Sequence, residues 1–235
     1  TYINPDEKLQ AEYEQKRVAY LEEKAALAQF VGKETKTADG VKVELCANIG
    51  KPEDALKVVE CDGEGIGLFR TEFLFMDRPQ IPTEEEQFAA YKKVAETLEG
   101  KPVIIRTLDV GGDKEIPYLA LEKEENPFLG FRAIRLCLKR EDLYRPQLKA
   151  LLRASAYGDI RIMVPMVTCL DELRAVKNMI AELKEELKAE GVAYDENIKV
   201  GIMIETPASS LMTDVFAIEA DFFSIGTNDL TGYTM

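Results

Sequence analysis

Two arginines stand directly after short apolar runs that are typical of β-strands, Arg70 after one run and Arg106 after another. A guanidinium at the end of a strand can form paired hydrogen bonds with the oxygens of a carboxylate or a phosphate. Each arginine taken alone could instead pair with a nearby acid, such as Glu72 or Asp109. Two arginines at equivalent strand ends favour anion binding.

Two carboxylates occupy similar positions, Glu205 and Asp229. The chain has no histidine, and a pair of carboxylates at neighbouring strand ends suits a hard cation such as Mg²⁺, although oxygen ligands also accept Mn²⁺. A metal between arginine-bound anions and carboxylates is an arrangement used in phosphoryl transfer. A general acid–base pair is the rival chemistry. Without a function, Glu205 would form an ion pair and Asp229 would cap a helix.

Two further cationic residues follow turn signals. A Gly-Gly pair after the strand that carries Arg106 could place backbone N–H groups or Lys114 near an anion, although a plain turn is the alternative. Pro127 suits the first position of a helix, and Arg132 follows it. Arg132 would add a third positive charge to the site, or lie on the surface of a helix.

From residue 41 onward, apolar runs alternate with amphipathic helical patterns. The predicted strands are Val43–Ile49, Gly65–Phe73, Val103–Asp109, Ile160–Val167, Val200–Thr206 and Phe222–Asn228. The predicted helices are Pro52–Glu60, Thr83–Leu98, Pro127–Ser155 in two pieces, Leu170–Glu190 and Pro207–Ile218. This alternation predicts a parallel sheet covered on both faces.

Local signals support these boundaries. Thr83 and Glu86 have the spacing of a capping box, and Gly191 stands where a helix C′ glycine belongs. Six βα units over about 195 residues, with polar residues at the strand ends, favour a barrel of the (β/α)8 type. An open doubly wound sheet also binds ligands at that edge.

The first 32 residues are polar, and the thin apolar stripe of their predicted helix is typical of a connector. Asp39-Gly40 then predicts a hairpin-type turn.

The composition excludes several classes of protein. The 235 residues contain 30 Lys and Arg against 43 Asp and Glu, a net charge of −13, which argues against nucleic-acid binding. No apolar run approaches the roughly 18 residues of a membrane span, so no membrane partner is expected. Four cysteines without a disulfide spacing fit a reducing cytoplasm. The absence of histidine excludes a Ser-His-Asp triad and a phosphohistidine within this segment.

Several longer motifs resemble enzyme I, the phosphoenolpyruvate–protein phosphotransferase family of the bacterial sugar phosphotransferase system. The resemblance covers nearly the whole chain in order and spacing. The motifs are Leu45–Gly50, Gly65–Arg78, Arg106–Lys114, Glu124–Gly130, Glu205–Ala208 and Asp221–Thr231.

The resemblance implies the C-terminal part of such an enzyme, a (β/α)8 TIM barrel that binds phosphoenolpyruvate and Mg²⁺ and forms a homodimer. The phosphoryl group would pass to a histidine on the protein's own N-terminal domain, and then to the histidine phosphocarrier protein. The resemblance implies no catalytic residue in this chain. The histidine that accepts the phosphoryl group and the cysteine that donates a proton to the enolpyruvate both lie outside this chain.

The resemblance also assigns roles to residues. Arg70 and Arg106 match substrate-binding arginines of the family. Glu205 and Asp229 match its metal ligands. Asn228 and Asp229 match residues that contact the substrate. Arg132 and Lys114 match residues of the same rim. Gly232 stands where the family usually has glutamine.

We expect residues 1–36 to be a helical linker from an absent phosphohistidine domain, and 37–235 to be the barrel without its last strands. The chain ends at Met235, before the family's later substrate arginine and cysteine, so we expect a fragment that does not turn over alone. A dikinase of the pyruvate phosphate dikinase or phosphoenolpyruvate synthase type shares most motifs, although Phe69 and Tyr233 favour enzyme I. A catalytically incomplete dimerisation fragment is the remaining alternative.

Overall fold

The computed structural model describes residues 2–76, 78–111 and 116–235, and it divides the chain into two units. The first unit, Thr1–Glu44, contains α1 (Glu7–Ala28), which buries none of its residues. Asp6 caps this helix, because its carboxylate accepts a hydrogen bond from the Leu9 amide at 2.8 Å. The predicted turn at Asp39-Gly40 is confirmed by an antiparallel bridge between Lys36 and Lys42.

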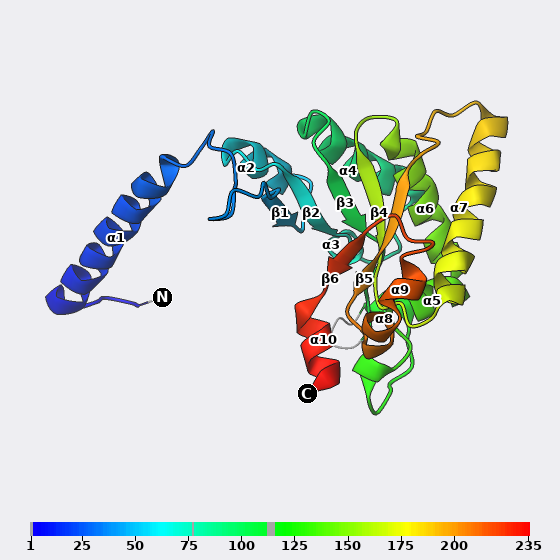
Figure 1. Ribbon diagram of the computed structural model, residues 1–235. Coiled ribbons are helices and arrows are strands. Elements are labelled where there is room, and N and C mark those ends of the chain that lie inside the picture. The colour runs from blue at the N-terminus through cyan, green and yellow to red at the C-terminus, as the bar shows by residue number, and fades with distance from the viewer. Residues whose placement is uncertain (1, 77, 112–115) are drawn as a thin grey trace. The chain divides into compact units, whose positions relative to one another are not determined.

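The second unit, Leu45–Met235, is built on one sheet of six parallel strands. They are β1 (Cys46–Ile49), β2 (Gly65–Arg70), β3 (Val103–Arg106), β4 (Ile160–Val164), β5 (Lys199–Ile204) and β6 (Phe223–Ile225). Their order in the sheet is their order in the chain, whereas the order of a doubly wound sheet reverses part-way. The strands form a curled half-barrel (Figure 1), which confirms the predicted α/β class and barrel-type sheet.

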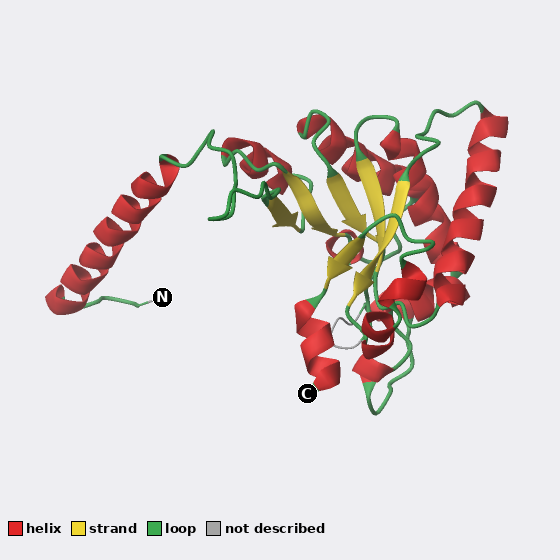
Figure 2. Ribbon diagram, viewed as in Figure 1, coloured by secondary structure: helices red, strands yellow, loops and turns green. Residues whose placement is uncertain are grey.

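Helices follow the strands. They are α2 (Asp54–Glu60), α3 (Glu72–Phe75), α4 (Glu84–Thr97), α5 (Ala133–Lys139), α6 (Glu141–Ser155), α7 (Leu170–Glu190), α8 (Pro207–Leu211), α9 (Thr213–Phe216) and α10 (Thr227–Thr234), with 3₁₀ turns η1 (Pro117–Leu119) and η2 (Pro127–Leu129). The longer helices, α4, α6 and α7, cover the outside of the sheet. Helix α6 packs against both α4 and α7. Figure 2 shows the strand arrowheads pointing to one end of the unit, where α10 begins after β6.

The capping signals are confirmed. Thr83 and Glu86 form a reciprocal capping box at the start of α4. Gly191 ends α7 with a φ of +68°, in the left-handed region where a side chain would add strain. No helix in the described ranges is long and apolar enough to cross a membrane.

Three predicted boundaries are wrong. The strand predicted to reach Asn228 ends at Ile225, because the chain turns at Gly226 into α10. The helical stretch Pro127–Ser155 is η2, α5 and α6, and Pro207–Ile218 is two short helices. Four further strands stop earlier than predicted, at Arg70 for β2, Arg106 for β3, Val164 for β4 and Ile204 for β5.

The central strands of the sheet are buried on both faces, as predicted, whereas β6 is not, since its Ile225 is 69% exposed. Ile162, Met163 and Val164 are consecutive residues of β4, and each is 0% exposed. Because successive side chains of a strand point to opposite faces, this run requires packing on both sides of the sheet. Phe69 on β2 meets Tyr91 on α4 edge to face, with 5.9 Å between the ring centroids.

Candidate functional site

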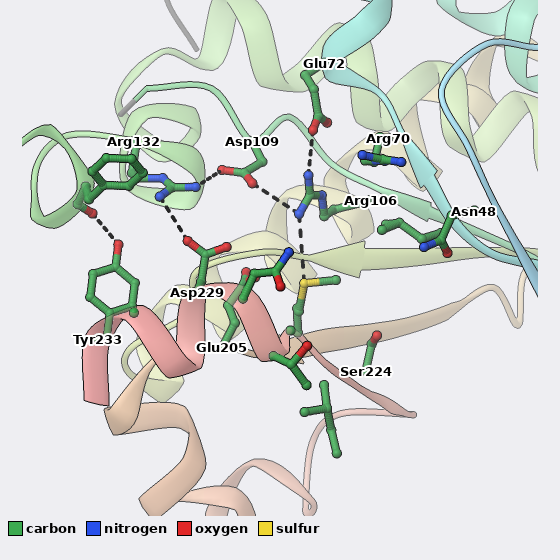
Figure 3. Close-up of a pocket in the computed structure, with 18 of the residues that line it drawn as sticks. Asn48, Arg70, Glu72, Arg106, Asp109, Arg132, Glu205, Ser224, Asp229 and Tyr233 are labelled. Carbon is green, nitrogen blue, oxygen red and sulfur yellow. Dashed lines mark hydrogen bonds and ion pairs between the residues drawn. The ribbon is translucent and has the colours of Figure 1, made fainter. Parts of the chain in front are cut away.

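A pocket of about 1620 Å³ opens at the carboxyl ends of the strands (Figure 3). It brings together most of the residues that the sequence singled out. Those that line it are Arg70, Arg106, Arg132, Glu205, Asn228 and Asp229. Lys114 lies outside the described residues.

Arg106 lies at the end of β3 and is 6% exposed. Its Nη2 is 2.6 Å from Oε1 of Glu72, and its Nη1 is 3.2 Å from Oδ2 of Asp109. Burial alone would lower the pKa of Arg106, but its carboxylate neighbours raise it above the ordinary value. Arg106 therefore stays charged, and the carboxylates fix its direction before any ligand binds.

Arg132 extends this arrangement from the start of α5. It is 2% exposed, with Nη2 at 2.8 Å from Oδ1 of Asp109 and Nη1 at 3.3 Å from Oδ1 of Asp229. The alternative of a surface helix arginine is therefore wrong. Glu72, Arg106, Asp109, Arg132 and Asp229 form a continuous series of alternating charges, the rim charge network.

Arg70 has different surroundings, although it is the register partner of Arg106 across β2 and β3. Its side chain is exposed and lies 5.8 Å from the centre of the Phe73 ring. In the part of the chain that the structure describes, its guanidinium makes no ion pair or hydrogen bond. The pairing with a local acid that was possible for both arginines thus occurs at Arg106 and not at Arg70.

Glu205 follows β5 and is 1% exposed. Its Oε1 accepts a hydrogen bond from the Met166 amide at 2.6 Å. Burial is the main reason why the pKa of Glu205 is raised to about 7. The hydrogen bond from the Met166 amide and the charge of Arg106 lower this pKa, whereas the carboxylates of Asp109 and Asp229 raise it. A Cβ at Gly226 would lie 2.7 Å from Oε2 of Glu205, so only glycine leaves this oxygen its space.

Glu205 and Asp229 fit a magnesium ion. A buried carboxylate with a raised pKa is stabilised in its charged form by a bound cation. Asp229, in the first turn of α10, has a side chain that is 25% exposed at the pocket. Among the described residues, no group of three or more potential ligands surrounds one point. Mg²⁺ typically takes one or two protein carboxylates and completes its shell with water and substrate oxygens.

The charges of the pocket also bear on its ligands. Among the described residues, the lining contains three arginines and four carboxylates when Glu205 is ionised. An anion that binds here adds further negative charge. A divalent cation beside Glu205 and Asp229 would offset that charge, so the anion and the metal are expected to bind together.

Comparison with known proteins decides the family. Residues 24–235 match the family described as PEP-utilising enzyme, PEP-binding domain. The chain belongs to this family. It is 59% identical over 233 residues to the phosphoenolpyruvate-protein phosphotransferases of Bacillus sp. (strain S) and Geobacillus stearothermophilus, and 54% identical over 233 residues to that of Bacillus subtilis.

These alignments cover 99% of the chain but about 40% of each relative, so this PEP-binding domain is homologous to the C-terminal part of an enzyme. The relatives are phosphotransferases, which favours enzyme I over the dikinases that share its motifs. The predicted family is confirmed.

The PEP-binding domain has further pocket residues that sequence reasoning did not single out. Asn48 and Ser224 line the pocket from β1 and β6. A polar residue inside an apolar strand was the available signal for each. Tyr233, noted only as a family marker, lines the pocket from α10 and donates its hydroxyl hydrogen bond to the carbonyl of Phe128.

Proposed function

We propose that this domain binds phosphoenolpyruvate together with Mg²⁺ and donates the phosphoryl group to a histidine on another domain, for relay to a histidine phosphocarrier protein. The observation that carries the proposal is the pocket itself, where three arginines face two carboxylates suited to a metal. The family and the phosphotransferase relatives support the same substrate.

The arginines would divide the work of binding. Arg70 and Arg106 would bind the phosphate and carboxylate oxygens of the substrate, with Asn228 as a further contact. Arg106 and Arg132 are already oriented by the rim charge network, so little reorganisation accompanies binding. The exposed Arg70 would become ordered on the ligand.

Glu205 and Asp229 would hold the magnesium ion. When bound, Mg²⁺ supplies positive charge beside the phosphate oxygens, where negative charge develops as the P–O bond to the enol oxygen breaks. Asp229 is also an ion-pair partner of Arg132, so its carboxylate connects the metal site to the anion site.

The phosphoryl acceptor would come from outside this chain, which contains no histidine. The P–O bond of phosphoenolpyruvate breaks, a P–N bond forms to the imidazole, and the enolate takes up a proton to become pyruvate. Self-association into a homodimer is part of the same proposal.

Calorimetric titration of phosphoenolpyruvate, with and without Mg²⁺, tests this proposal. We expect binding that needs the metal, and a loss of affinity of about hundredfold in Arg70→Gln and in Glu205→Gln. Arg140→Gln is a matched control, because Arg140 is a charged surface residue paired with Asp142 and does not line the pocket. Equal affinity in all three variants would contradict the proposal.

A further inference from the structure

A buried hydrogen-bond network lies beneath the ends of β2 and β3, with Gln147 of α6 at its centre. Gln147 is 0% exposed. Its Oε1 accepts from the Leu108 amide at 2.9 Å, and its Nε2 donates to the Thr71 hydroxyl at 3.1 Å and the Tyr91 hydroxyl at 3.2 Å. Turning the amide over would place its donors against the Leu108 N–H, so the network fixes one orientation.

These bonds replace the sheet ladder where the ladder stops. Arg70 and Arg106 are the last register partners of β2 and β3. Just beyond them, the Thr71 hydroxyl donates to the Arg106 carbonyl at 2.8 Å, and Gln147 bonds to both Thr71 and Leu108. One side chain on α6 thus joins the turn after Arg70 to the turn after Arg106.

The residues that Gln147 contacts are next to the residues that orient Arg106. Thr71 precedes Glu72, and Leu108 precedes Asp109, and these two carboxylates bind the Arg106 guanidinium. We infer that Gln147 is a positioning residue, which sets the spacing of the two anion-binding strand ends without lining the pocket itself. Its effect on phosphoenolpyruvate rests on the proposed function, whereas its effect on the two turns does not.

Gln87 provides a matched control from the same network. It is also 0% exposed, accepts from the Tyr91 hydroxyl at 3.2 Å, and donates to the Pro82 carbonyl at 3.1 Å. None of its hydrogen bonds reaches either strand-end turn. Gln87→Met and Gln147→Met therefore remove the same chemical group from the same network. Only Gln147→Met removes hydrogen bonds to the turns that follow Arg70 and Arg106.

We would compare both variants with the unaltered 235-residue chain by two measurements. In titrations of phosphoenolpyruvate with Mg²⁺, Gln147→Met is expected to raise the dissociation constant about tenfold, and Gln87→Met by less than about twofold. In hydrogen exchange, Gln147→Met is expected to speed exchange at residues 70–72 and 106–109 and to leave β4 unchanged. A general loss of stability would affect both variants alike.

Equal losses of affinity in the two variants, or unchanged exchange at both turns in Gln147→Met, would overturn the inference. If the unaltered chain binds no phosphoenolpyruvate, the proposed function fails, and the exchange measurement alone decides the role of Gln147. If Gln147→Met does not fold, Thr71→Val removes the hydrogen bond between Gln147 and Thr71, together with the bond from the Thr71 hydroxyl to the Arg106 carbonyl. Hydrogen exchange at both turns that is as slow in Thr71→Val as in the unaltered chain would also overturn the inference about Gln147.

Discussion

The ends of β2 and β3 carry arginines at matching register positions, yet their surroundings are opposite. Arg106 is 6% exposed and paired with two carboxylates, whereas Arg70 is exposed and contacts an aromatic ring. The same sequence pattern, an apolar run followed by arginine, therefore produces one arginine that carboxylates hold in place and one that forms no ion pair with the described residues. Stability and binding should depend on Arg106, and binding alone on Arg70.

The largest expected effect is on the stability of the chain when the buried Arg106 is replaced. Arg106→Met leaves the Glu72 and Asp109 carboxylates without their shared cation, so we expect a loss of about 3–5 kcal/mol in the free energy of unfolding. Urea denaturation measures it. Arg70→Met is the control, with an expected change within about 0.5 kcal/mol. Similar losses in the two variants would remove the distinction between the strand ends.

Glu205 extends the comparison to a buried carboxylate that forms no ion pair with the described residues and is 1% exposed. Its pKa rises from 4.5 to about 7 on folding, so the folded chain keeps a proton that the unfolded chain releases. Its contribution to stability without metal should fall as pH rises from 4.5 to 7, by up to about 3 kcal/mol.

Denaturation at several pH values in EDTA, compared between the unaltered chain and Glu205→Gln, isolates this contribution. The variant should gain stability relative to the unaltered chain as pH rises through this range. A difference between the two proteins that does not vary with pH would show that folding leaves the pKa of Glu205 unchanged.

The raised pKa of Glu205 also predicts a smaller effect, on the affinity for Mg²⁺. Because Mg²⁺ requires the ionised carboxylate, its affinity should fall about tenfold per pH unit below the Glu205 pKa of about 7. Titration of Mg²⁺ at pH 5.5, 6.5 and 8 measures this dependence. A constant affinity between pH 5.5 and 8 would argue against Glu205 as a ligand.

The smallest expected effect is on ligand affinity, when the ring beside the exposed Arg70 is replaced. Phe73→Leu removes the ring beside Arg70, an exposed cation–π contact worth about 0.5–1 kcal/mol. We expect phosphoenolpyruvate affinity to fall about two- to fivefold, with thermal stability nearly unchanged. Phe131→Leu, on an exposed phenylalanine that does not line the pocket, is the control.

The sequence predicted the sheet well because strands buried on both faces contain consecutive apolar residues, as in Ile162, Met163 and Val164 of β4. It predicted that several polar residues gather in one pocket, because the polar residues that follow such runs lie at the same edge of the sheet. It overextended the strands, since residues such as Thr227 continue the sequence pattern while the backbone has already entered α10.

The carboxylate partners were harder to predict. Asp109 was considered only as an alternative partner that would argue against function, but it binds Arg106 and Arg132 while lining the pocket. Gln147 carries no local signal, because its three partners come from α4 and from two turns far away in the sequence. Contacts of this kind depend on tertiary packing.

The sequential strand order also has a consequence for how the chain folds during synthesis. Each strand pairs with the strands that come just before and just after it in the chain, from β1 to β6. A newly made strand can therefore dock on an edge that the ribosome has already released, without waiting for a distant segment. The half-barrel can grow from β1 toward β6, and the two proposed metal ligands, Glu205 and Asp229, come into place after the strands that carry Arg70 and Arg106.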